Sequence, residues 1–392
     1  MKSRSESISV LRLGILWLAG ADLRLTFLAV PPVLPLIHRD LHLSEKAIGL
    51  LSGLPVLMLG LAAIPGSLMI ARLGARRATI AALVFVAAVA AARGVGPSRP
   101  MLFSMTVLMG AGVAVIQPAL PTLVAEWFAA MPAFATAIYA NGLLVGEAVP
   151  AAAMIPLVLP LVGGDWAVGL ALWSAPLAAT ALLIAVATPA AARPDRRAPV
   201  RWQPDWRSKL TWQLGLLMGG TGGLYFSVNA FIPDYLHAIG RPDLVSACLG
   251  ALNSGQLPAS FLALFAIRRL TATRLPFIVT PLLGVVGLGA LLAKVGWLIV
   301  LGVGVTGLFI SFGLILTLAL PPQLAATEDV HRLSAGMFAI GYTMSCIVPL
   351  IGGVIWDATG VPITAFAAGV ASALTVAATG LTLHPRLDRA HA

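Results

Sequence analysis

The sequence predicts an all-α polytopic membrane protein with twelve transmembrane helices in two pseudo-symmetric six-helix bundles, and three observations support this. Of the 392 residues, 59% are hydrophobic and only 10% are charged, whereas a soluble domain carries about 25% charged residues. The apolar residues fall into twelve runs that are long enough to cross a bilayer, which takes about 20 residues. The two halves of the chain also share short motifs in the same order.

Each apolar run is one expected helix. In chain order the runs cover residues 11–37, 47–70, 78–96, 101–125, 133–161, 166–188, 211–237, 243–267, 275–293, 295–320, 332–356 and 361–384. Glycine and proline are frequent inside them, which membrane helices tolerate because neighbouring helices and side chains satisfy the freed backbone groups. The runs divide the chain into an N-terminal bundle at 1–190, a basic cytoplasmic linker at 191–210 and a C-terminal bundle at 211–392. The basic residues of the linker are expected either to bind anionic membrane lipids or to form a solvated loop that sets the orientation.

The distribution of Lys and Arg predicts that orientation. The chain carries 25 Lys and Arg residues against 15 Asp and Glu residues, and most of the cations lie on the side that holds the N-terminus. The predicted outer loops hold only Arg39, Lys46, Arg93, Arg99, Arg241 and Lys294. Because cytoplasmic loops are enriched in Lys and Arg, we expect a multi-pass protein of the cell inner membrane with both termini in the cytoplasm. This anchoring explains the net charge of +10 without a nucleic-acid partner.

Several classes of function are disfavoured by what the sequence lacks. The two cysteines, Cys248 and Cys346, lie in apolar runs, which argues against a disulfide framework or a zinc site. No phosphate-binding G-x-x-x-x-G-K-[ST] loop occurs, so transport driven by ATP is disfavoured. No cluster has metal-ligand spacing, and no histidine lies deep enough in a run to serve a Ser/His/Asp enzyme. We therefore expect no cofactor, no metal and no enzymatic activity, and the longest loop, 191–210, leaves no room for the output domain of a sensor.

The second half of the chain repeats features of the first at an offset of roughly 200 residues. The matched pairs are Val30–Pro35 with Val228–Pro233, Ser52–Pro55 with Ser254–Pro258, Ala119–Pro121 with Ala319–Pro321, and Val149–Pro150 with Val348–Pro349. Two six-helix halves of the same orientation are related by an axis along the membrane normal, and they can rock about a site near the midplane in the mechanism called alternating access. The repeat therefore predicts a transporter with its cavity between the halves.

The stretch Gly66–Arg77, between the second and third runs, resembles the cytoplasmic loop motif of the major facilitator superfamily. The aspartate of that motif would fall near Ala71, so the charge relay attributed to the loop cannot be complete here. Twelve helices in two sets of six fit the same superfamily. The resemblance implies the major facilitator fold, in which the first, fourth, seventh and tenth helices line a central cavity.

Within that superfamily, the chain resembles the cyanate and 2-nitroimidazole transporter family. The resemblance is carried by Asp22-Leu23-Arg24, by Val30–Pro35 and by Gly49–Pro55, and Gly112–Gln117 also fits. Family members show Asn-Leu-Arg-Pro at the first of these positions, whereas here Asp22 replaces the asparagine and Leu25 the proline. The resemblance implies secondary active transport of a small solute and a functional arginine in the first helix.

Arg24 is the leading candidate for contact with the solute. It lies near the middle of the first run, and a charge at the bilayer centre costs about 2.5–3.5 kcal/mol on insertion scales. Such a residue should face the interior of the bundle and have a partner. The guanidinium is a planar fork of donors that suits a carboxylate-like or linear anion. The alternative is a structural ion pair with Asp22 or Glu147.

Asp22 and Glu147 are the candidates for proton coupling. Asp22 is two residues from Arg24 and so lies on a different side of the helix; as a replacement for asparagine it shifts weight toward neutral, cationic or zwitterionic solutes. Glu147 lies in the interior of the fifth run, where desolvation disfavours the charged form of a carboxyl group. The repeat places Cys346 at the position equivalent to Glu147. The alternative for Glu147 is a salt bridge to Arg24.

Milder polar residues within the runs are candidates for lining the cavity. They are Gln117, Tyr139, Asn141, Tyr225, Asn229, Asn253, Gln256 and Tyr342. Each of them has the alternative role of a hydrogen bond between helices, which is common for Asn and Gln in membranes.

These observations together predict a monomeric, proton-coupled symporter of a small solute, either a cyanate-like anion or a small polar heteroaromatic compound. The alternative is a proton-coupled exporter of amphipathic drugs. That alternative follows from Gly142-x-x-x-Gly146 followed by Pro150, which faintly resembles the antiporter motif of drug exporters. An Arg24 side chain held in an ion pair and shut off from solutes would favour the exporter.

Overall fold

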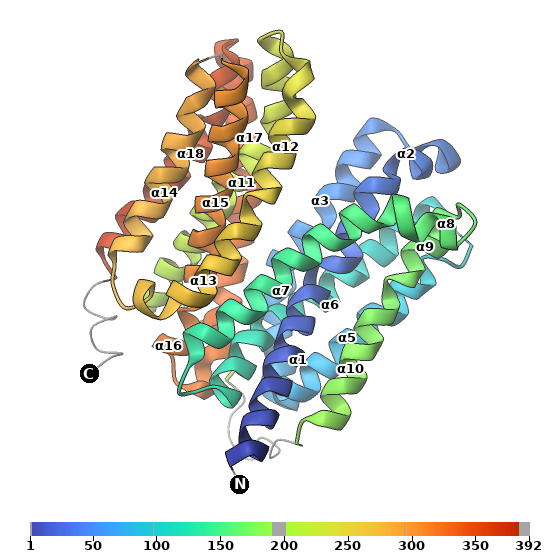
Figure 1. Cartoon of the computed structure of the whole chain (residues 1–392), viewed down its shortest axis with the longest axis vertical. Helices are drawn as coiled ribbons and strands as arrows, with labels where there is room; N and C mark the ends of the chain where they lie inside the picture. The colour runs from blue at the N-terminus through green and yellow to red at the C-terminus, as the bar shows by residue number, and fades with distance from the viewer. Residues whose placement is uncertain (1, 97, 190–200, 294, 384–392) are drawn as a thin grey trace. The chain divides into compact units, whose positions relative to one another are not determined.

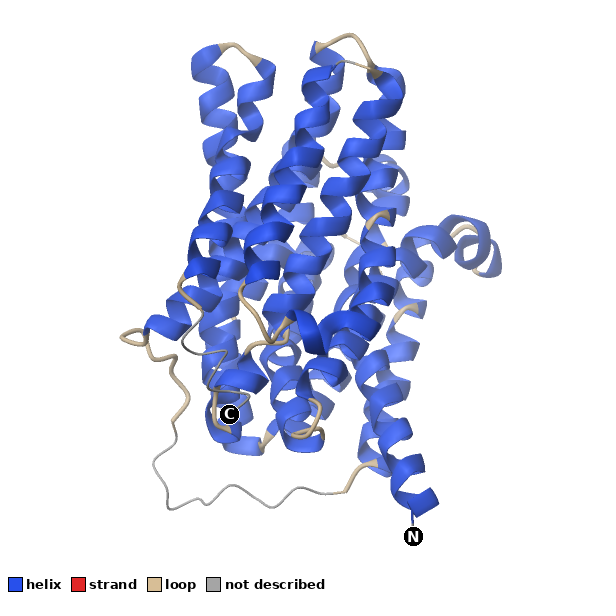
Figure 2. Cartoon of the chain, turned by 60° about the vertical axis from the view of Figure 1, so that its left-hand side comes forward, coloured by secondary structure: helices blue, strands red, loops and turns tan. Residues whose placement is uncertain are grey.

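The computed structural model describes residues 2–96, 98–189, 201–293 and 295–383, and among these residues it contains helices and no strands (Figures 1 and 2). The helices of the first half are α1 (Lys2–Leu28), α2 (Val30–Leu41), α3 (Glu45–Leu61), α4 (Ala63–Leu73), α5 (Ala75–Ala92), α6 (Arg99–Trp127), α7 (Pro132–Ala153) with a π-helical continuation (Met154–Val158), α8 (Leu159–Leu161), α9 (Trp166–Leu172) and α10 (Ser174–Ala187). The helices of the second half are α11 (Lys209–Ala238), α12 (Val245–Ser254), α13 (Gln256–Leu270), α14 (Leu275–Leu288), α15 (Gly296–Leu318), α16 (Pro321–Leu324), α17 (Val330–Thr359) and α18 (Ala367–Leu381). Short 3₁₀ turns occupy Pro242–Leu244, Gly289–Ala293, Thr327–Asp329 and Pro362–Phe366.

Most of the predicted spans are found as helices that are long and apolar enough to cross a membrane. Nine such helices occur among the described residues, and the bent pair Gly53–Leu61 and Ala63–Leu73 makes a tenth if it is counted as one span. The other two predicted spans fall on α11, which has 30 residues but many glycines and polar side chains, and on α12 and α13, which have 10 and 15 residues and are separated at Gly255.

Four of the predicted spans are each divided into two helices, and proline explains each division. A proline has no N–H to donate to the carbonyl four residues earlier, and its ring clashes with that carbonyl. In each divided span the first helix ends four residues before a proline. The helix ends and their prolines are Leu28 with Pro32, Leu61 with Pro65, Leu172 with Pro176, and Ser254 with Pro258. Each break therefore lies where a proline removes a main-chain hydrogen bond, and no loop separates the two helices by more than one residue.

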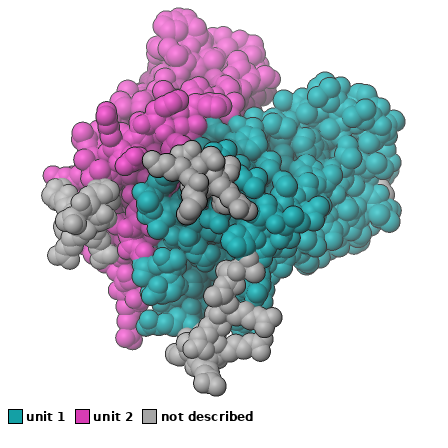
Figure 3. All heavy atoms as spheres, turned by 60° about the horizontal axis from the view of Figure 1, so that its bottom comes forward, with its two compact units in different colours: residues 1–131, 138–204, 326–335 teal, residues 132–137, 205–325, 336–392 magenta. Residues whose placement is uncertain are grey.

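The chain forms two compact units, which Figure 3 colours separately. Unit 1 consists of residues 1–131, 138–204 and 326–335, and unit 2 consists of residues 132–137, 205–325 and 336–392. Two helices therefore belong to both units, because the first residues of α7 are assigned to unit 2 and the first residues of α17 to unit 1.

Helix α6 lies at the centre of unit 1, since it packs against α3, α4 and α5 and is buried along most of its length. Helix α5 also packs against α10, and α10 packs against α1. The contact between α4 and α6 is close, because a Cβ atom at Gly66 would lie 2.9 Å from the Cα atom of Val115. One side of α1 is therefore covered by α10.

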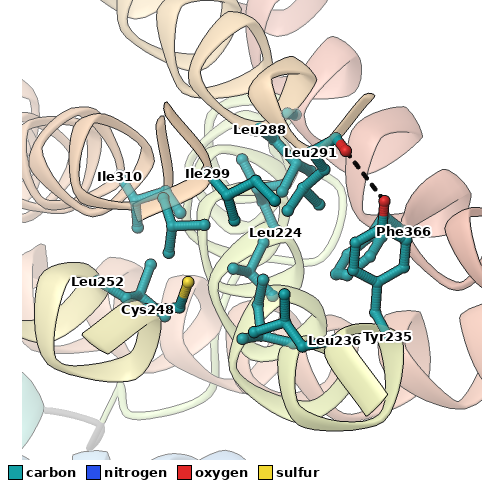
Figure 4. Close-up of a cluster of buried hydrophobic side chains, with 14 residues drawn as sticks. Leu224, Tyr235, Leu236, Cys248, Leu252, Leu288, Leu291, Ile299, Ile310 and Phe366 are labelled. Carbon is teal, nitrogen blue, oxygen red and sulfur yellow. Dashed lines mark hydrogen bonds between the residues drawn. The ribbon is translucent and has the colours of Figure 1, made fainter. Parts of the chain in front are cut away.

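Unit 2 is built around α15, which packs against α11, α12, α13 and α14, while α18 covers α11 and α14. A cluster of buried apolar side chains joins these helices (Figure 4). It includes Leu224 and Tyr235 of α11, Cys248 of α12 and Ile299 of α15. The Tyr235 hydroxyl donates a hydrogen bond of 3.0 Å to the main-chain oxygen of Leu291, which satisfies the one polar atom that this ring brings into the core.

Arg93 corrects one detail of the sequence prediction. It was expected in an outer loop, but its side chain is 2% exposed and donates from Nη2 to the main-chain oxygen of Thr26 at 3.1 Å. Helix α1 ends at Leu28, so the carbonyl groups of its last turn lack partners within the helix. A cation at a helix C-terminus is also favoured by the helix dipole. Arg93, directly after α5, therefore caps α1 with a buried side chain and is not part of a solvated loop.

Three parts of the orientation prediction fall outside the described residues. These are the linker arginines 193, 196 and 197, Lys294, and the C-terminal arginines 386 and 389. The basic stretch Arg72–Arg77 is described, and Arg76 in it caps α10 by donating from Nε to Thr188 Oγ1 at 2.7 Å and from Nη2 to the Ala185 oxygen at 2.8 Å. Gly74, the residue between α4 and α5, has a φ of 79°, a backbone conformation that favours glycine.

Candidate functional site

The structure pairs the two buried charges that the sequence singled out. Arg24 Nε lies 3.0 Å from Glu147 Oε1, and the side chains are 14% and 23% exposed. Among residues 19–27 of α1, every residue except Arg24 is buried. Arg24 is thus the one partly exposed residue of this stretch of α1, and both side chains of the ion pair keep some exposed surface.

Small residues bring α1 and α7 close enough for this pair to form. A Cβ atom at Gly146 would lie 2.7 Å from the Cα atom of Ala21, and one at Gly142 would lie 2.9 Å from the carbonyl carbon of Trp17. In the same contact, a Cβ atom at Gly20 of α1 would lie 2.9 Å from the carbonyl carbon of Tyr139 of α7. Small residues permit this close approach of membrane helices. The Gly142-x-x-x-Gly146 pattern therefore has a packing role beside the ion pair.

Trp17 is a member of this site that sequence reasoning missed. Its indole Nε1 donates a hydrogen bond of 2.8 Å to Asn141 Oδ1, about two helical turns along α1 from Arg24. Because the amide oxygen of Asn141 accepts this bond, its NH₂ group points away from Trp17 and acts as a donor. The spacing of Trp17, Ala21 and Arg24, which lie on one face of a helix, was the available signal.

The other candidates of unit 1 are more deeply buried. Tyr139 is 2% exposed, and Gln117 on α6 is 3% exposed. Asp22 is 1% exposed, and its carboxylate accepts a hydrogen bond from the Thr180 hydroxyl on α10. Asp22 therefore faces α10 while Arg24 faces α7, and the expectation that these neighbours lie on different sides of α1 agrees with the contacts. Of the two partners considered for Arg24, the ion pair contains Glu147.

Four candidates of unit 2 form one hydrogen-bonded cluster, which we call the amide cluster: Tyr225, Asn229, Asn253 and Gln256. The Tyr225 hydroxyl donates to Asn253 Oδ1 at 2.8 Å, and Gln256 Nε2 donates to the same oxygen at 3.3 Å. Asn229 Nδ2 lies 3.5 Å from the Tyr225 hydroxyl oxygen. The cluster joins α11, α12 and α13. Its four members are uncharged, so they can form hydrogen bonds with a solute but carry no net charge that would attract an ion.

Tyr342 lies on α17, is 3% exposed, and stacks on Phe338 with ring centroids 6.0 Å apart and an interplanar angle of 17°. Within the part of the chain that the structure describes, no group of three or more His, Cys, Asp or Glu side chains could hold a metal ion. Both cysteines are free thiols. Two groups of candidate residues are thus brought together by the fold: the ion pair with Asn141 in unit 1 and the amide cluster in unit 2.

Comparison with known proteins gives the fold a family. The family model of the Major Facilitator Superfamily matches residues 16–353. A crystal structure of FucP, a transporter of that superfamily, in the outward conformation has a TM-score of 0.74 over 96% of this chain and 99% of that chain, at 14% sequence identity. A crystal structure of a variant of the Escherichia coli fucose:proton symporter FucP has a TM-score of 0.72 over 95% and 98% of the two chains, also at 14% identity. The predicted all-α membrane fold is confirmed.

Curated relatives cover the chain almost from end to end. The cyanate transport protein CynX of Escherichia coli is 27% identical over 88% of this chain and 90% of its own length. The 2-nitroimidazole transporter of the same organism is 28% identical over 90% of this chain and 89% of its own length. An uncharacterized transporter of Bacillus subtilis, YycB, is 26% identical over 88% and 86%. The predicted resemblance to cyanate and 2-nitroimidazole transporters is confirmed at this level of similarity.

Proposed function

The chain belongs to the Major Facilitator Superfamily, and from that premise we propose that this secondary transporter moves a small anion, or a small polar heteroaromatic compound, together with protons. The observation that carries the proposal is the ion pair of Arg24 and Glu147, with 3.0 Å between the charged atoms and both side chains partly accessible. Ionisable residues inside membrane helices are costly and usually mark a substrate or ion pathway, and a charge that binds a solute has to be reached by it.

The ion pair supplies a way to couple the solute to a proton. An anionic solute competes with Glu147 for the guanidinium of Arg24, since both are acceptors for the same donors. When the solute binds the guanidinium in place of Glu147, Glu147 loses its counter-charge. A carboxylate that has no counter-charge and is shielded from bulk water takes up a proton. One anion and one proton then cross together by alternating access. Asn141 donates to the solute beside Arg24, and Asp22, which faces α10, is the less direct candidate for a proton carrier.

The neutral groups of unit 2 suit hydrogen bonding to an uncharged polar solute. The amide cluster of Tyr225, Asn229, Asn253 and Gln256 offers a phenol and three amides. Amides and hydroxyls both donate and accept, so these groups match the ring nitrogens and nitro or carbonyl oxygens of a polar heteroaromatic compound. Gln117, Tyr139 and Tyr342 remain candidates for contact with the solute.

Replacement of Glu147 by Gln is expected to abolish the response of uptake to a pH gradient. The amide keeps the shape of the carboxyl group but cannot take up a proton. The measurement is uptake of labelled cyanate and of 2-nitroimidazole by proteoliposomes, with and without an inward proton gradient. Glu126→Gln is the matched control, because Glu126 is an exposed glutamate near the end of α6. A Glu147→Gln protein that still responds fully to the gradient would exclude Glu147 as the proton carrier.

Export of amphipathic drugs is the second candidate, because Arg24 is in an ion pair, which is one of the two conditions that would favour the exporter. The other condition, that Arg24 is shut off from solutes, is not met, since the two side chains are 14% and 23% exposed. The packing role of Gly142 and Gly146 against α1 weakens the motif on which the alternative rested. The same proteoliposomes decide between the two. Efflux of an amphipathic dye driven by protons, with no uptake of cyanate or 2-nitroimidazole, would favour the exporter.

The proposal also places the protein in the membrane. The chain is a multi-pass membrane protein of a bacterial-type transporter family. We place it as a monomer in the inner membrane with both termini in the cytoplasm, because Lys and Arg are concentrated on that side. Protease accessibility of tags at each terminus in right-side-out vesicles tests this orientation.

A further inference from the structure

The side chain of Arg93 brings more hydrogen-bond donors into unit 1 than its neighbours accept. It is 2% exposed, and its Nη2 atom donates to the main-chain oxygen of Thr26 at 3.1 Å. Its Nε and Nη1 atoms are buried and have no hydrogen-bond partner among the described residues. A buried donor without a partner is costly, and more so when the group is charged. An acceptor is therefore expected beside these two nitrogens.

The hydroxyl group of Thr26 adds a third donor at the same place. Thr26 is 0% exposed, and its Oγ1 atom has no hydrogen-bond partner among the described residues. A threonine inside a helix can donate to the main-chain oxygen four residues earlier, as Thr79, Thr106 and Thr122 do in this protein. Since the main-chain oxygen of Thr26 holds Arg93, the unpartnered donors of these two residues lie close together.

The charge of Arg93 has no counter-charge either. None of the ion pairs among the described residues contains Arg93. Asp22 lies one turn before Thr26 on α1, but its carboxylate accepts a hydrogen bond from Thr180 of α10. A buried charge is normally paired, because its removal from water is otherwise uncompensated. A water molecule supplies an acceptor but no charge, so charge balance favours an anion as the acceptor.

The packing around Arg93 sets the size of that anion. Arg93 directly follows the span Ala75–Ala92, and Thr26 lies in the last turn of α1. Helix α9 packs against both α2 and α5 at this end of unit 1 (Figure 1). The packing is tight, because a Cβ atom at Gly94 would lie 2.7 Å from the Cβ atom of Ala171. The site therefore suits an ion of one or a few atoms, and its place at the helix ends brings it near the water on that side.

We propose that Arg93 and Thr26 bind one small inorganic anion, such as chloride, where the end of α5 meets the last turn of α1. The anion accepts hydrogen bonds from Nε and Nη1 of Arg93 and from Oγ1 of Thr26, and it balances the charge of the guanidinium. It thereby stabilises the end of α1 together with the cap that Nη2 supplies. This inference goes beyond the proposed function, since the site involves neither Arg24 nor Glu147 and requires no transport.

Thermal unfolding of the purified protein in detergent tests the anion site. The probes are sodium chloride and sodium gluconate at equal ionic strength, because the gluconate anion is too large for so closely packed a site. We expect the parent protein to unfold about 3 °C higher in chloride, the shift that a ligand at about ten times its Kd gives. In crystals soaked with bromide, an anomalous scattering peak is expected beside the guanidinium of Arg93.

A matched pair of threonine variants locates the effect. Thr26→Val removes a donor that has no partner in the protein, so the variant should fold, and in gluconate it should be at least as stable as the parent. It should need about ten times more chloride for half of the stabilisation, because a hydrogen bond to a charged acceptor is lost. Thr79→Val is the control, since Thr79 is also 0% exposed but donates within α5; it should respond to chloride as the parent does.

The remaining outcomes decide against the site. Equal unfolding temperatures of the parent in chloride and gluconate, or equal chloride responses of Thr26→Val and Thr79→Val, would mean that water alone meets these donors. A chloride response that is lost in Arg24→Lys and kept in Thr26→Val would place the anion at Arg24 instead. No uptake is measured in this experiment, so failure of the Arg93 site does not imply failure of the proposed function.

Discussion

Arg24→Ala is expected to abolish uptake of the solute and to destabilise the protein as well. The guanidinium is the positive charge that attracts an anion, and it is also the counter-charge of Glu147 at 3.0 Å. Removal of one partner of a buried ion pair typically costs about 3–5 kcal/mol, because the other charge is left uncompensated. Since both side chains of this pair are partly accessible, we expect about 3 kcal/mol, at the lower end of that range.

A second variant separates the two effects of Arg24. The double variant Arg24→Ala with Glu147→Ala removes both charges, so most of the lost stability should return while uptake stays absent. Thermal unfolding in detergent measures the first quantity and proteoliposome uptake the second. Arg24→Lys keeps the charge but loses the fork of donors, and it should retain stability with weaker binding of the solute. Normal uptake by a folded Arg24→Ala protein would remove the basis of the proposed function.

Gly146→Ala is expected to separate α1 from α7 and to reduce uptake about tenfold or more. The new methyl group would lie 2.7 Å from the Cα atom of Ala21, which is closer than carbon atoms can pack. The helices must therefore move apart by a fraction of an ångström or more. Overpacking of this kind costs about 1–3 kcal/mol, and a displacement of about 1 Å at a site is enough to reduce its activity by about a hundredfold. The distance between Arg24 and Glu147 should increase with it.

Gly14→Ala is the matched control for this effect. Gly14 lies in α1, and a Cβ atom there would meet nothing within 4 Å. Alanine is also a better helix former than glycine by about 1 kcal/mol, so this variant should be as stable as the parent or more stable, with unchanged uptake. Gly142→Ala should behave like Gly146→Ala. Equal behaviour of all three variants would show that the close approach of α1 and α7 is not required.

The hydropathy pattern predicted the positions of the spans well, but not where they break. Pro32, Pro65, Pro176 and Pro258 each end a helix four residues earlier, whereas Pro118 and Pro121 lie inside a continuous α6. The local chemistry of all six residues is the same. Pro55 and Pro349 also lie inside continuous helices, so proline alone does not decide whether a helix ends. A proline in a membrane sequence therefore predicts where a helix can break, but not whether it does.

For the candidate site, the charges could be predicted and their partners could not. A lone Arg24 in an apolar run requires a partner, and the sequence offered both Asp22 and Glu147. The choice depends on which helix approaches α1 on which side, and this is set by Gly20, Gly142 and Gly146. The four residues of the amide cluster were named one by one, but their joint hydrogen bonding depends on the packing of α11 on α12.

The hydrogen bonds that hold residues 201–203 could not be predicted from side chains, and Trp17 was missed although its spacing from Arg24 was an available signal. Main-chain oxygens accept the bonds from Ser67, His331 and Arg332, and every residue has a main-chain oxygen, so the sequence carries no signal for them. Tryptophan is common at membrane interfaces, so its presence in the first run did not by itself predict the hydrogen bond to Asn141.

The ion pair has a consequence for the energetics of the cycle. The unloaded pair of Arg24 and Glu147 has no net charge. If a monovalent anion replaces Glu147 on the guanidinium and Glu147 takes one proton, the loaded site also has no net charge. Work against a transmembrane voltage is about 2.3 kcal/mol per elementary charge for each 100 mV, and it vanishes for an electroneutral step. A transporter built on this pair would therefore draw on the pH difference alone, and a potassium diffusion potential set with valinomycin should leave its rate unchanged.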